Sequence, residues 1–406
     1  MLTVEEAQQA VLASVEALPP ERMPLLQAMG CVLAEALVAG IALPPFDNSA
    51  MDGYAVIAED TRGATPGTPR ALAVIEDLPA GKSPTRGIER GKAARIMTGA
   101  AVPAGADAVV IVEHTRPGPS GSAEVLVEAR PGDNIRSAGE DIRAGEVALP
   151  PGQVLGPAEL GLAAALGYTH VTVIRRPRVA IVTTGSELIP PGQDLPPAAI
   201  YNSNQVTLAA RVLGAGAEVA QLLHVADDEG AVEGALRRCS EADLILTTGG
   251  VSVGEYDFVK AALERLGEIR FWRVLMKPGK PVAFGKVLGR PLFGLPGNPL
   301  SALVTFEILV APALRKMAGR EDCLPRTAQA ALLTDVSHTP PRRDYVQALA
   351  QLTEDGYLVQ PAAKRGSAML TSAVGANCLL VIPEQSTGLR AGEQVTIILL
   401  PHRHGP

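Results

Sequence analysis

The chain has 406 residues, which at roughly 150 residues per domain leaves room for two to four domains and excludes a single small module. Hydrophobic residues make up 47 % and charged residues 19 %, a composition typical of folded rather than disordered proteins. The net charge of −7 and the aromatic content of 3 % argue against a nucleic-acid partner, which needs basic and stacking side chains.

The N-terminus, the apolar segments and the cysteines favour a cytoplasmic protein that does not bind a membrane. Residues 1–10 contain Glu5 and Glu6 and lack the basic and apolar regions of a signal peptide. The most apolar helical run, residues 302–314, is shorter than the roughly 18 residues that a membrane span requires. The four cysteines lie too far apart in sequence for a CxxC motif, so we expect reduced thiols.

The first part of the chain predicts a helix followed by a β-rich domain. Thr3 and Glu6 have the spacing of a capping box at the start of an apolar helical repeat, which we expect to end near residues 19–20. Short apolar runs separated by glycine and proline then predict strands at residues 54–58, 72–75 and 108–112. Because a helical pattern returns over residues 155–166, we expect the β-rich part to be inserted between two segments of a more helical domain.

The residues from 178 onward predict an α/β domain and then a small all-β domain. Apolar strands alternate with helices, which favours a mostly parallel sheet that is covered on both faces and binds ligands beyond the carboxyl ends of its strands. The strands are expected at residues 179–183, 218–223 and 244–247, and the helices at residues 205–213, 228–239 and 258–266. Past Pro325, runs such as residues 345–349 and 395–400 predict strands alone.

Two Thr-Thr-Gly turns, residues 183–185 and 247–249, each end a predicted strand. Glycines at such positions let backbone N–H groups approach an anion such as phosphate. A tight turn with an aspartate N-cap is the simpler explanation of one such loop, but two loops on one sheet edge favour an anion site. The second loop continues through the candidates Gly250, Ser252, Gly254 and Asp257, and neither loop carries a Rossmann or P-loop fingerprint.

Acidic residues in polar, glycine-rich segments are candidate ligands of Mg²⁺, which takes one or two carboxylates together with waters and substrate phosphates. Taken singly, each acid is more simply explained as the cap of a turn. The candidates are Asp47, Asp52, Glu140, Asp141, Glu187, Asp227, Asp228 and Asp257.

Basic residues in stiff loops are candidate oxyanion ligands. Lys277 and Lys280 lie in the segment Met-Lys-Pro-Gly-Lys-Pro, whose prolines fix the backbone, and Arg136 lies in Asn-Ile-Arg. Lysines beside a turn also serve simply to solvate it. The turn at residues 294–299 precedes a predicted helix with Pro299 in its first turn, and it either presents backbone donors to an anion or only turns the chain. We find no recognisable nucleophile motif.

Taken together, these segments resemble the MoeA-type molybdopterin molybdenumtransferases, the family that includes the gephyrin C-terminal domain. The motif PPFDNSAMDGYA at residues 44–55 is highly specific, and the match runs in order over nearly the whole chain. The other matching segments are IMTGA at 96–100, NIRSAGEDI at 134–142, TTGSEL at 183–188, TGGVSVGEYD at 248–257, MKPGKP at 276–281 and GLPGNPLSA at 294–302.

The resemblance implies an elongated, multidomain fold of the α/β plus β class. Its four parts would be an elongated domain from residues 1–43 and 144–176, an inserted β-rich domain at 44–143, an α/β molybdopterin-binding domain at 177–325 and a C-terminal β-barrel at 326–406. It also implies a homodimer whose site lies between the α/β domain of one subunit and other domains of its mate.

The resemblance further implies an enzyme of molybdenum cofactor biosynthesis. Such an enzyme inserts molybdenum from molybdate into adenylylated molybdopterin, releases AMP and is assisted by Mg²⁺ (magnesium) or another divalent cation. Two alternatives are a molybdopterin adenylyltransferase, which shares the TTGG-containing loop, and a scaffold protein of the gephyrin type. The expected protein partners are the molybdopterin adenylyltransferase and the apo-molybdoenzymes.

The family's roles carry over to residues in the matching motifs. Catalytic roles fall on Asp52, Thr98, Asp141, Glu187, Asp228, Asp257, Lys277 and Lys280, and metal binding on Asp52, Asp141, Glu187 and Asp257. Cofactor binding falls on Arg136, Thr184, Gly185, Ser186, Gly249, Gly250, Ser252, Gly254, Pro296, Gly297, Asn298, Arg343 and Ser367. The doublet Asp227–Asp228 leaves open which carboxylate matches, and Ser186 stands where many relatives have aspartate.

Overall fold

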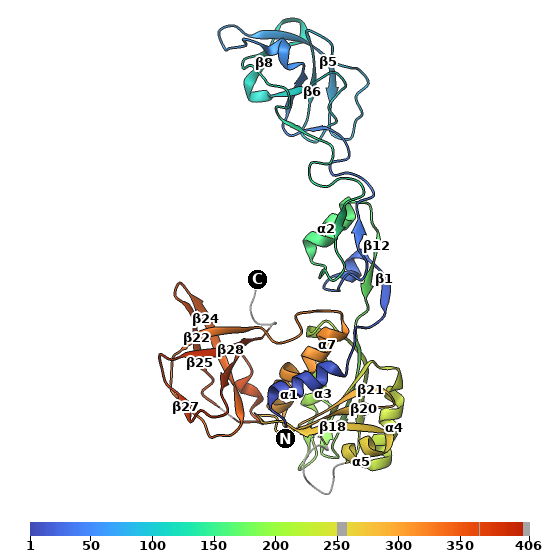
Figure 1. The fold of residues 1–406 in the computed structure, drawn as a ribbon, viewed down its shortest axis with the longest axis vertical. Coiled ribbons are helices and arrows are strands. Elements are labelled where there is room, and N and C mark those ends of the chain that lie inside the picture. The colour runs from blue at the N-terminus through green and yellow to red at the C-terminus, as the bar shows by residue number, and fades with distance from the viewer. Residues whose placement is uncertain (250–257, 365, 401–406) are drawn as a thin grey trace. The chain divides into compact units, whose positions relative to one another are not determined.

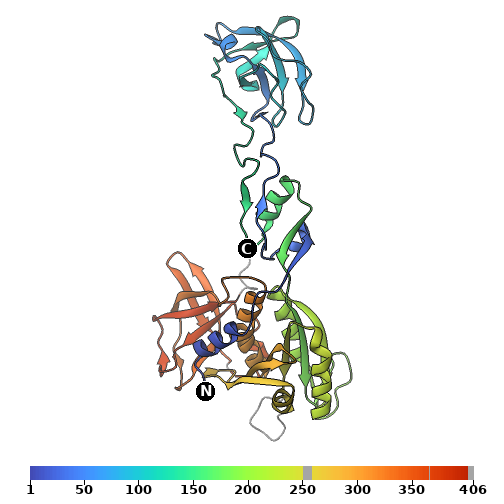
Figure 2. The same cartoon turned by 45° about the vertical axis from the view of Figure 1, so that its right-hand side comes forward.

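The computed structural model describes residues 1–249, 258–364 and 366–400. The chain divides into two compact units, whose elements are labelled in Figure 1 and seen from a second side in Figure 2. Unit 1 consists of Met1–Arg22, Gly30–Ala34 and Thr172–Pro406, and unit 2 consists of Met23–Met29 and Glu35–Val171. Within the described ranges, no helix is long and apolar enough to cross a membrane.

Unit 2 is built around a six-stranded β-sheet. The strands, in the order in which they pair, are β7 (Ala108–Ile111), β4 (Gly53–Val56), β6 (Lys92–Ile96), β5 (Arg70–Leu78), β9 (Ser122–Val125) and β8 (Thr115–Pro117). Neighbouring residues such as Ala55 and Val56 pack into two different apolar clusters, because successive side chains of a strand point to opposite faces. The three strands predicted for this part of the chain are therefore confirmed.

Strand β4 begins at Gly53, where close packing against a neighbouring strand requires a glycine. A Cβ atom at this position would lie 2.0 Å from the carbonyl oxygen of Val110 on the paired strand β7. Any larger residue would therefore push the two strands apart.

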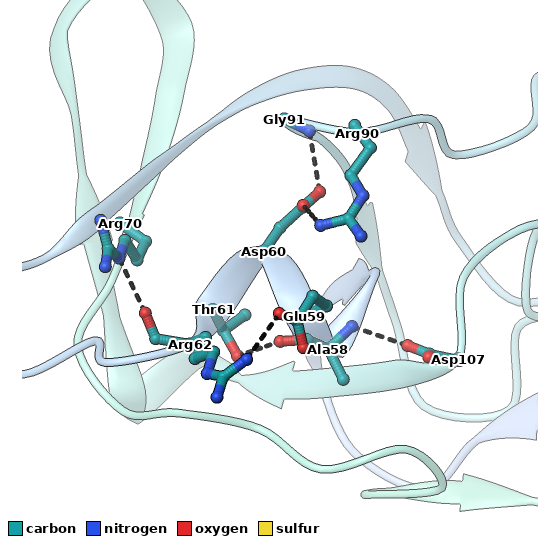
Figure 3. A network of polar contacts seen from close by, with 9 residues as sticks. All are labelled: Ala58, Glu59, Asp60, Thr61, Arg62, Arg70, Arg90, Gly91 and Asp107. Carbon is teal, nitrogen blue, oxygen red and sulfur yellow. Dashed lines mark hydrogen bonds and ion pairs between the residues drawn. The ribbon is translucent and has the colours of Figure 1, made fainter.

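Side-chain contacts attach a short 3-10 turn, η2 (Ala58–Thr61), to the rest of unit 2 (Figure 3). The backbone N–H of Ala58 donates to Oδ1 of Asp107 at 2.7 Å, and Asp60 pairs with Arg90 at 3.0 Å. The charges of Asp107, Asp60 and Arg90 are thus used in contacts within unit 2, which indicates that these three residues have a structural role.

The remaining elements up to residue 174 are short. They are β1 (Pro20–Pro24), η1 (Leu25–Ala28), β2 (Leu37–Val38), β3 (Asn48–Ser49), η3 (Val112–His114), η4 (Pro119–Gly121), β10 (Ile135–Arg136), β11 (Val147–Leu149), α2 (Pro157–Ala165) and β12 (His170–Ile174). Helix α2 confirms the helix predicted for this region, whereas the division of the chain into four domains stays a prediction.

Unit 1 contains a six-stranded mixed sheet. Its strands, in pairing order, are β16 (Glu218–Val225), β13 (Arg178–Thr184), β17 (Leu244–Thr248), β21 (Arg290–Leu295), β20 (Pro281–Val287) and β18 (Gly267–Arg273). The first four strands run parallel, and the last two pair antiparallel. The sequence analysis did not predict β18, β20 and β21.

In the described residues 267–295, no helix separates β18, β20 and β21, and a tight turn joins the last two of these strands. Leu288 and Gly289, which join β20 to β21, both have positive φ angles of 49° and 77°. Two consecutive positive φ angles are typical of the two-residue turn that reverses a strand directly into an antiparallel hairpin.

Helices cover both faces of this sheet, as predicted. Helices α4 (Glu229–Arg238) and α5 (Phe258–Leu266) pack on the face of Ala180 and Val182. The opposite face, with Val179 and Ile181, packs against α1 (Val4–Ala13), α3 (Ser203–Gly214), α6 (Pro299–Thr305), the π-helical turn η6 (Phe306–Val310) and α7 (Ala311–Met317). Figure 1 shows these two helical layers.

Helix α1 begins as predicted and ends earlier than predicted. Thr3 accepts from the backbone of Glu6 and the Glu6 side chain accepts from the backbone of Thr3, which confirms the capping box. The helix ends at Ala13 rather than near residue 19. The hydroxyl of Ser14 donates to the carbonyl oxygen of Ala10 at 2.7 Å, so a polar side chain satisfies the last turn.

The C-terminal part of unit 1 is a closed five-stranded β-barrel, which confirms the predicted barrel. Pairing runs through β24 (Arg343–Thr353), β25 (Gly356–Pro361), β22 (Thr327–Leu332), β28 (Gln394–Leu399) and β26 (Cys378–Ile382), and β26 pairs with β24 to close the ring. Tyr345, Leu379 and Ile398 belong to the same apolar cluster as α1 and α7, so the barrel packs against the α/β layer.

Seven short elements complete the described part of unit 1. They are β14 (Leu188–Ile189), β15 (Ile200–Tyr201), η5 (Cys239–Glu241), β19 (Met276–Lys277), β23 (Val336–Ser337), η7 (Leu370–Ser372) and β27 (Gly388–Leu389).

All four cysteines are free thiols, as predicted.

Candidate functional site

The two Thr-Thr-Gly turns lie side by side at the carboxyl edge of the sheet in unit 1. Strands β13 and β17 are parallel neighbours, and their register pairs Thr183 with Thr248. Gly249 has a φ of 94°, and a Cβ atom there would lie 2.6 Å from both the carbonyl and hydroxyl oxygens of Thr184. Only glycine allows this close approach of the two turns. The prediction that both turns share one sheet edge is therefore confirmed.

A polar cavity of about 600 Å³, here called the strand-end cavity, lies at this edge. Two buried asparagines form part of its wall: Asn202 donates to Thr183 Oγ1 at 2.8 Å, and Asn204 donates to Thr248 Oγ1 at 2.9 Å. Among the described residues, Asn204 Oδ1 and Thr184 Oγ1 have no hydrogen-bond partner. Buried oxygens of this kind are acceptors ready for a ligand's N–H or O–H group. The candidates Thr184, Glu187, Gly249, Pro296, Gly297 and Asn298 all line this cavity.

A second cavity of about 510 Å³, here called the lysine cavity, lies between the α/β layer and the barrel. Its lining includes the predicted Lys277, Lys280 and Ser367. The same wall carries Arg342, Asp344 and Lys364 from the barrel side. Four basic side chains and one carboxylate make this a cationic cavity that suits a multivalent anion.

The two cavities adjoin, because Pro281, Pro296 and Asn298 line both of them. Asn298 Nδ2 also donates to Ser367 Oγ at 3.1 Å, and the backbone N–H of Leu300 donates to the Ser367 carbonyl oxygen at 3.1 Å. The turn before α6 is thus tied to a barrel loop, so residues from both parts of unit 1 hold the boundary between the cavities.

Strand pairing fixes the position of Lys277. The two-residue strand β19 runs parallel to β24, and its register places Lys277 beside Asp344. The Lys277 ammonium lies 2.9 Å from Oδ2 of Asp344, whose side chain is only 8 % exposed. A backbone ladder and a buried carboxylate together hold this lysine in place.

Arg343 does not line either cavity in the described part of the chain; its neighbour Arg342 lines the lysine cavity. The guanidinium of Arg343 forms ion pairs with Glu5 of α1 and with Glu384, the latter at 2.7 Å. Burial works against its charge, but the hydrogen bond to Glu5 raises the pKa of Arg343 above its ordinary value. Ion pairs thus hold Arg343 between α1 and the barrel, whereas Arg342 lies at the wall of the lysine cavity; the binding role of Arg343 stays a prediction.

The acidic candidates of unit 1 have different surroundings. Asp228 caps α4 by accepting from the backbone N–H of Ala231 at 2.8 Å, whereas Asp227 accepts from the backbone N–H of Ser186 at 3.4 Å. Asp227 is therefore the member of the doublet that contacts the Thr-Thr-Gly-Ser turn. The candidates Gly250, Ser252, Gly254 and Asp257 lie outside the described residues. Within the described ranges, no group of three or more His, Cys, Asp or Glu residues is arranged to hold a metal ion.

Unit 2 brings two predicted residues together. Asp52 accepts from the backbone N–H and from the hydroxyl of Thr98 at 2.7 and 2.8 Å. The backbone hydrogen bond, and then the hydroxyl, lower the pKa of Asp52 below its ordinary value, so the exposed carboxylate stays ionised. Arg136 and Asp141 are exposed in the same unit.

The sequence analysis missed several residues of the cavity walls. Lys364 and Arg342 lie in barrel segments without a sharp motif, and Asp344 is set beside Lys277 only by the pairing of β19 with β24. Asn202 and Asn204 flank Ser203 at the start of α3, a pattern that signals a helix N-cap before it signals a ligand.

Comparisons with known proteins match nearly the whole length of the chain. Residues 2–167 match the family description "MoeA N-terminal region (domain I and II)", residues 180–316 match "Probable molybdopterin binding domain", and residues 329–400 match "MoeA C-terminal region (domain IV)". A Mycobacterium tuberculosis protein named molybdopterin molybdenumtransferase 2 is 45 % identical over 98 % of this chain and 99 % of its own length. The chain belongs to the MoeA family of molybdopterin molybdenumtransferases.

Other members of the MoeA family match over the same full length. A molybdopterin molybdenumtransferase of Haemophilus influenzae is 37 % identical, with all of both chains covered. The crystal structure of the molybdopterin biosynthesis protein MoeA from Pyrococcus horikoshii superimposes with a TM-score of 0.82 at 33 % identity, covering 98 % of this chain and 100 % of that one. The resemblance inferred from the motifs is thus confirmed.

Proposed function

We propose that this protein transfers molybdenum from molybdate to adenylylated molybdopterin and releases AMP. The observation that carries the proposal is the pair of adjoining cavities in unit 1, one cationic and one rich in buried acceptors and glycine turns. A reaction between a small oxyanion and a larger phosphorylated heterocycle needs two such subsites in contact. The names of the relatives supply the substrate class.

The lysine cavity is the proposed molybdate subsite. Lys277, Lys280, Arg342 and Lys364 bring four positive charges to its wall, against one carboxylate from Asp344. Fixed cations in a partly enclosed cavity stabilise an oxyanion more strongly than mobile ions in water do. Because Asp344 and the β19–β24 ladder already hold Lys277, little side-chain entropy remains to be lost when the anion binds.

The strand-end cavity is the proposed subsite for adenylylated molybdopterin. Gly249 and the turn at residues 296–298 bring main chain to its wall, where backbone donors suit phosphate oxygens. The oxygens of Asn204 and Thr184 that have no partner among the described residues suit the N–H groups of a nitrogen-rich ring. Substrate bound here places its reacting end at the boundary formed by Pro296 and Asn298, beside the molybdate.

Among the described residues, the strand-end cavity offers one carboxylate, that of Glu187, as a ligand for a divalent cation. Glu187 lines that cavity with an exposed side chain, and Mg²⁺ needs only one or two protein carboxylates when substrate phosphates complete its shell. Glu187 would hold the ion, which would offset the charge of the phosphate groups. The proposed ligands Asp52 and Asp141 belong to unit 2, and Asp257 lies outside the described residues.

The decisive experiment separates molybdenum insertion from adenylylation. Purified protein is incubated either with ATP and molybdopterin or with adenylylated molybdopterin, molybdate and Mg²⁺, and the products are molybdenum cofactor and AMP. We expect product only in the second mixture, with Lys280→Ala at least tenfold slower and Lys92→Ala, at a half-exposed lysine of unit 2, unchanged. Product in the first mixture alone would assign the adenylyltransferase activity instead.

A homodimer with a shared site follows from the resemblance and stays a proposal. Its test mixes Lys280→Ala chains with Asp52→Ala chains after the residual activity of each has been measured. If one site needs unit 1 of one chain and unit 2 of another, a mixed dimer contains one site with both substitutions and one site with neither. Each mixed dimer then regains up to about one wild-type site. No recovery under conditions that exchange subunits would refute the shared site.

A further inference from the structure

His338 is a buried histidine whose ring has no described hydrogen-bond partner. It follows β23 (Val336–Ser337) and precedes β24, and its side chain is fully buried. Within the described chain, neither ring nitrogen makes a hydrogen bond. Burying such a ring without partners costs free energy, so its presence in the fold calls for an explanation.

The carboxylate of Asp344 links this histidine to the lysine cavity. Oδ2 of Asp344 lies 2.9 Å from Nζ of Lys277 and 3.5 Å from Nδ1 of His338. The Asp344 side chain is 8 % exposed, whereas that of Lys277 is 47 % exposed at the cavity wall. A buried imidazole and an accessible ammonium group therefore approach the same carboxylate oxygen of Asp344.

The chemistry of the ring indicates which nitrogen carries hydrogen. A bare nitrogen lone pair that faces a carboxylate oxygen is repelled, whereas an N–H group is attracted. The tautomer with hydrogen on Nδ1 is therefore the one that this contact favours. At 3.5 Å the contact is an electrostatic one that lies outside hydrogen-bond geometry.

We propose that His338 is a positioning residue for oxyanion binding: through Asp344, it keeps the Lys277 ammonium at the wall of the lysine cavity. This inference rests on the proposed function of that cavity. His338 touches no substrate; it limits rotation of the Asp344 side chain. The orientation of the carboxylate in turn selects the orientation of the lysine.

The expected effect of losing His338 is weaker oxyanion binding without a slower chemical step. When Asp344 is free to turn, Lys277 samples other directions, and ordering it again lowers the affinity for the anion. For residues in one contact network we expect a change of about three- to tenfold.

The test uses two substitutions. His338→Phe keeps a planar ring and removes both nitrogens, whereas His338→Asn is smaller but keeps an N–H donor close to the position of Nδ1. Both variants retain the hydrogen bond from the backbone N–H of residue 338 to the carbonyl oxygen of Thr387. Molybdate affinity is measured by calorimetry with sodium molybdate alone, and the KM for molybdate and kcat are measured in the insertion assay.

We expect His338→Phe to raise both the Kd and the KM for molybdate about three- to tenfold with kcat unchanged, and His338→Asn to restore most of the loss. In the Asp344→Asn background, His338→Phe should have no further effect, because the carboxylate through which His338 acts on Lys277 is already absent. Unchanged molybdate affinity, additive effects in the double variant, or no recovery with Asn would overturn the proposal.

One measurement on the unmodified protein needs no variant. Nitrogen NMR of ¹⁵N-histidine-labelled protein at neutral pH should show His338 protonated at Nδ1, and a ring protonated only at Nε2 would overturn the proposal even if the Phe variant fails to fold. If the wild-type protein binds molybdate but inserts no molybdenum, the proposed function fails and the calorimetry still decides the role of His338.

Discussion

Substituting Arg342 and Arg343 one at a time tests the assignment of the oxyanion site, because the two neighbours have different surroundings. Arg342 lines the lysine cavity, whereas Arg343 is paired with Glu5 and Glu384. Arg342→Ala should therefore weaken molybdate binding, and Arg343→Ala should lower stability.

The magnitudes follow from the two environments. A hydrogen bond to a charged group contributes about 1.5–3 kcal/mol, and 1.4 kcal/mol is a factor of ten, so the half-buried Arg342 should change the KM for molybdate about tenfold. Arg343 and Glu384 are each 22 % exposed. Since removing a partner from a fully buried ion pair costs about 3–5 kcal/mol and exposed pairs contribute at most about 1, we expect a loss of about 2 kcal/mol.

The assay combines initial rates of molybdenum insertion over a range of molybdate concentrations with thermal unfolding of both variants. We expect Arg342→Ala to unfold like the wild type and Arg343→Ala to unfold at a lower temperature with an unchanged KM. An increase of the KM in Arg343→Ala but not in Arg342→Ala would show that the reasoning from the cavity lining is wrong.

Three further predictions concern the turns and caps. Gly249→Ala should destabilise the protein by about 1–3 kcal/mol and weaken binding of adenylylated molybdopterin, whereas Gly392→Ala, with a φ of 87° and open space around it, should show the backbone strain alone in thermal unfolding. Asp228→Ala should cost about 0.5–2 kcal/mol through loss of the α4 cap, whereas Asp227→Ala should lower the insertion rate at unchanged stability; the opposite pattern would assign the site carboxylate to Asp228. In Thr98→Val, the pKa of Asp52 should rise toward its ordinary value of 3.8 but stay below it, as a carbon NMR titration measures. Because the folded-state pKa is lowered, the stabilisation by Asp52 is present above pH 3.8 and is lost as the pH falls through the folded-state value.

Much of the α/β layer could be predicted because local patterns determine it. The apolar run ending at Thr184 and the run ending at Thr248 are buried strands, and parallel strands bring their carboxyl ends to one edge of a sheet. Glycines immediately after both strands then place the turns beside one cavity. The position of the strand-end cavity thus follows from spacing and burial alone.

Contacts between distant segments could not be predicted in the same way. The parallel pairing of Lys277 with Asp344 joins residues 67 positions apart, and the sequence of neither segment predicts this pairing. The choice between Arg342 and Arg343 depends on where β24 begins, and a shift of one residue along a strand moves a side chain to the opposite face.

The short hairpin of β20 and β21 was missed for a related reason. Its turn, Leu288–Gly289, carries only one glycine and lacks the Asn-Gly or Asp-Gly pair that marks such turns most clearly. The missed strands are joined by the antiparallel pairings of β21 with β20 and of β20 with β18, where the alternation of strands with helices gives no guidance.

The central claim is that Lys277, Lys280 and Arg342 hold the oxyanion in the lysine cavity. Crystals of the protein soaked in molybdate test it most directly, because anomalous scattering from molybdenum locates the metal without assumptions about the ligand. The claim predicts an anomalous peak enclosed by these three side chains. An ordered peak elsewhere in the protein, with the lysine cavity empty of molybdenum, would contradict it.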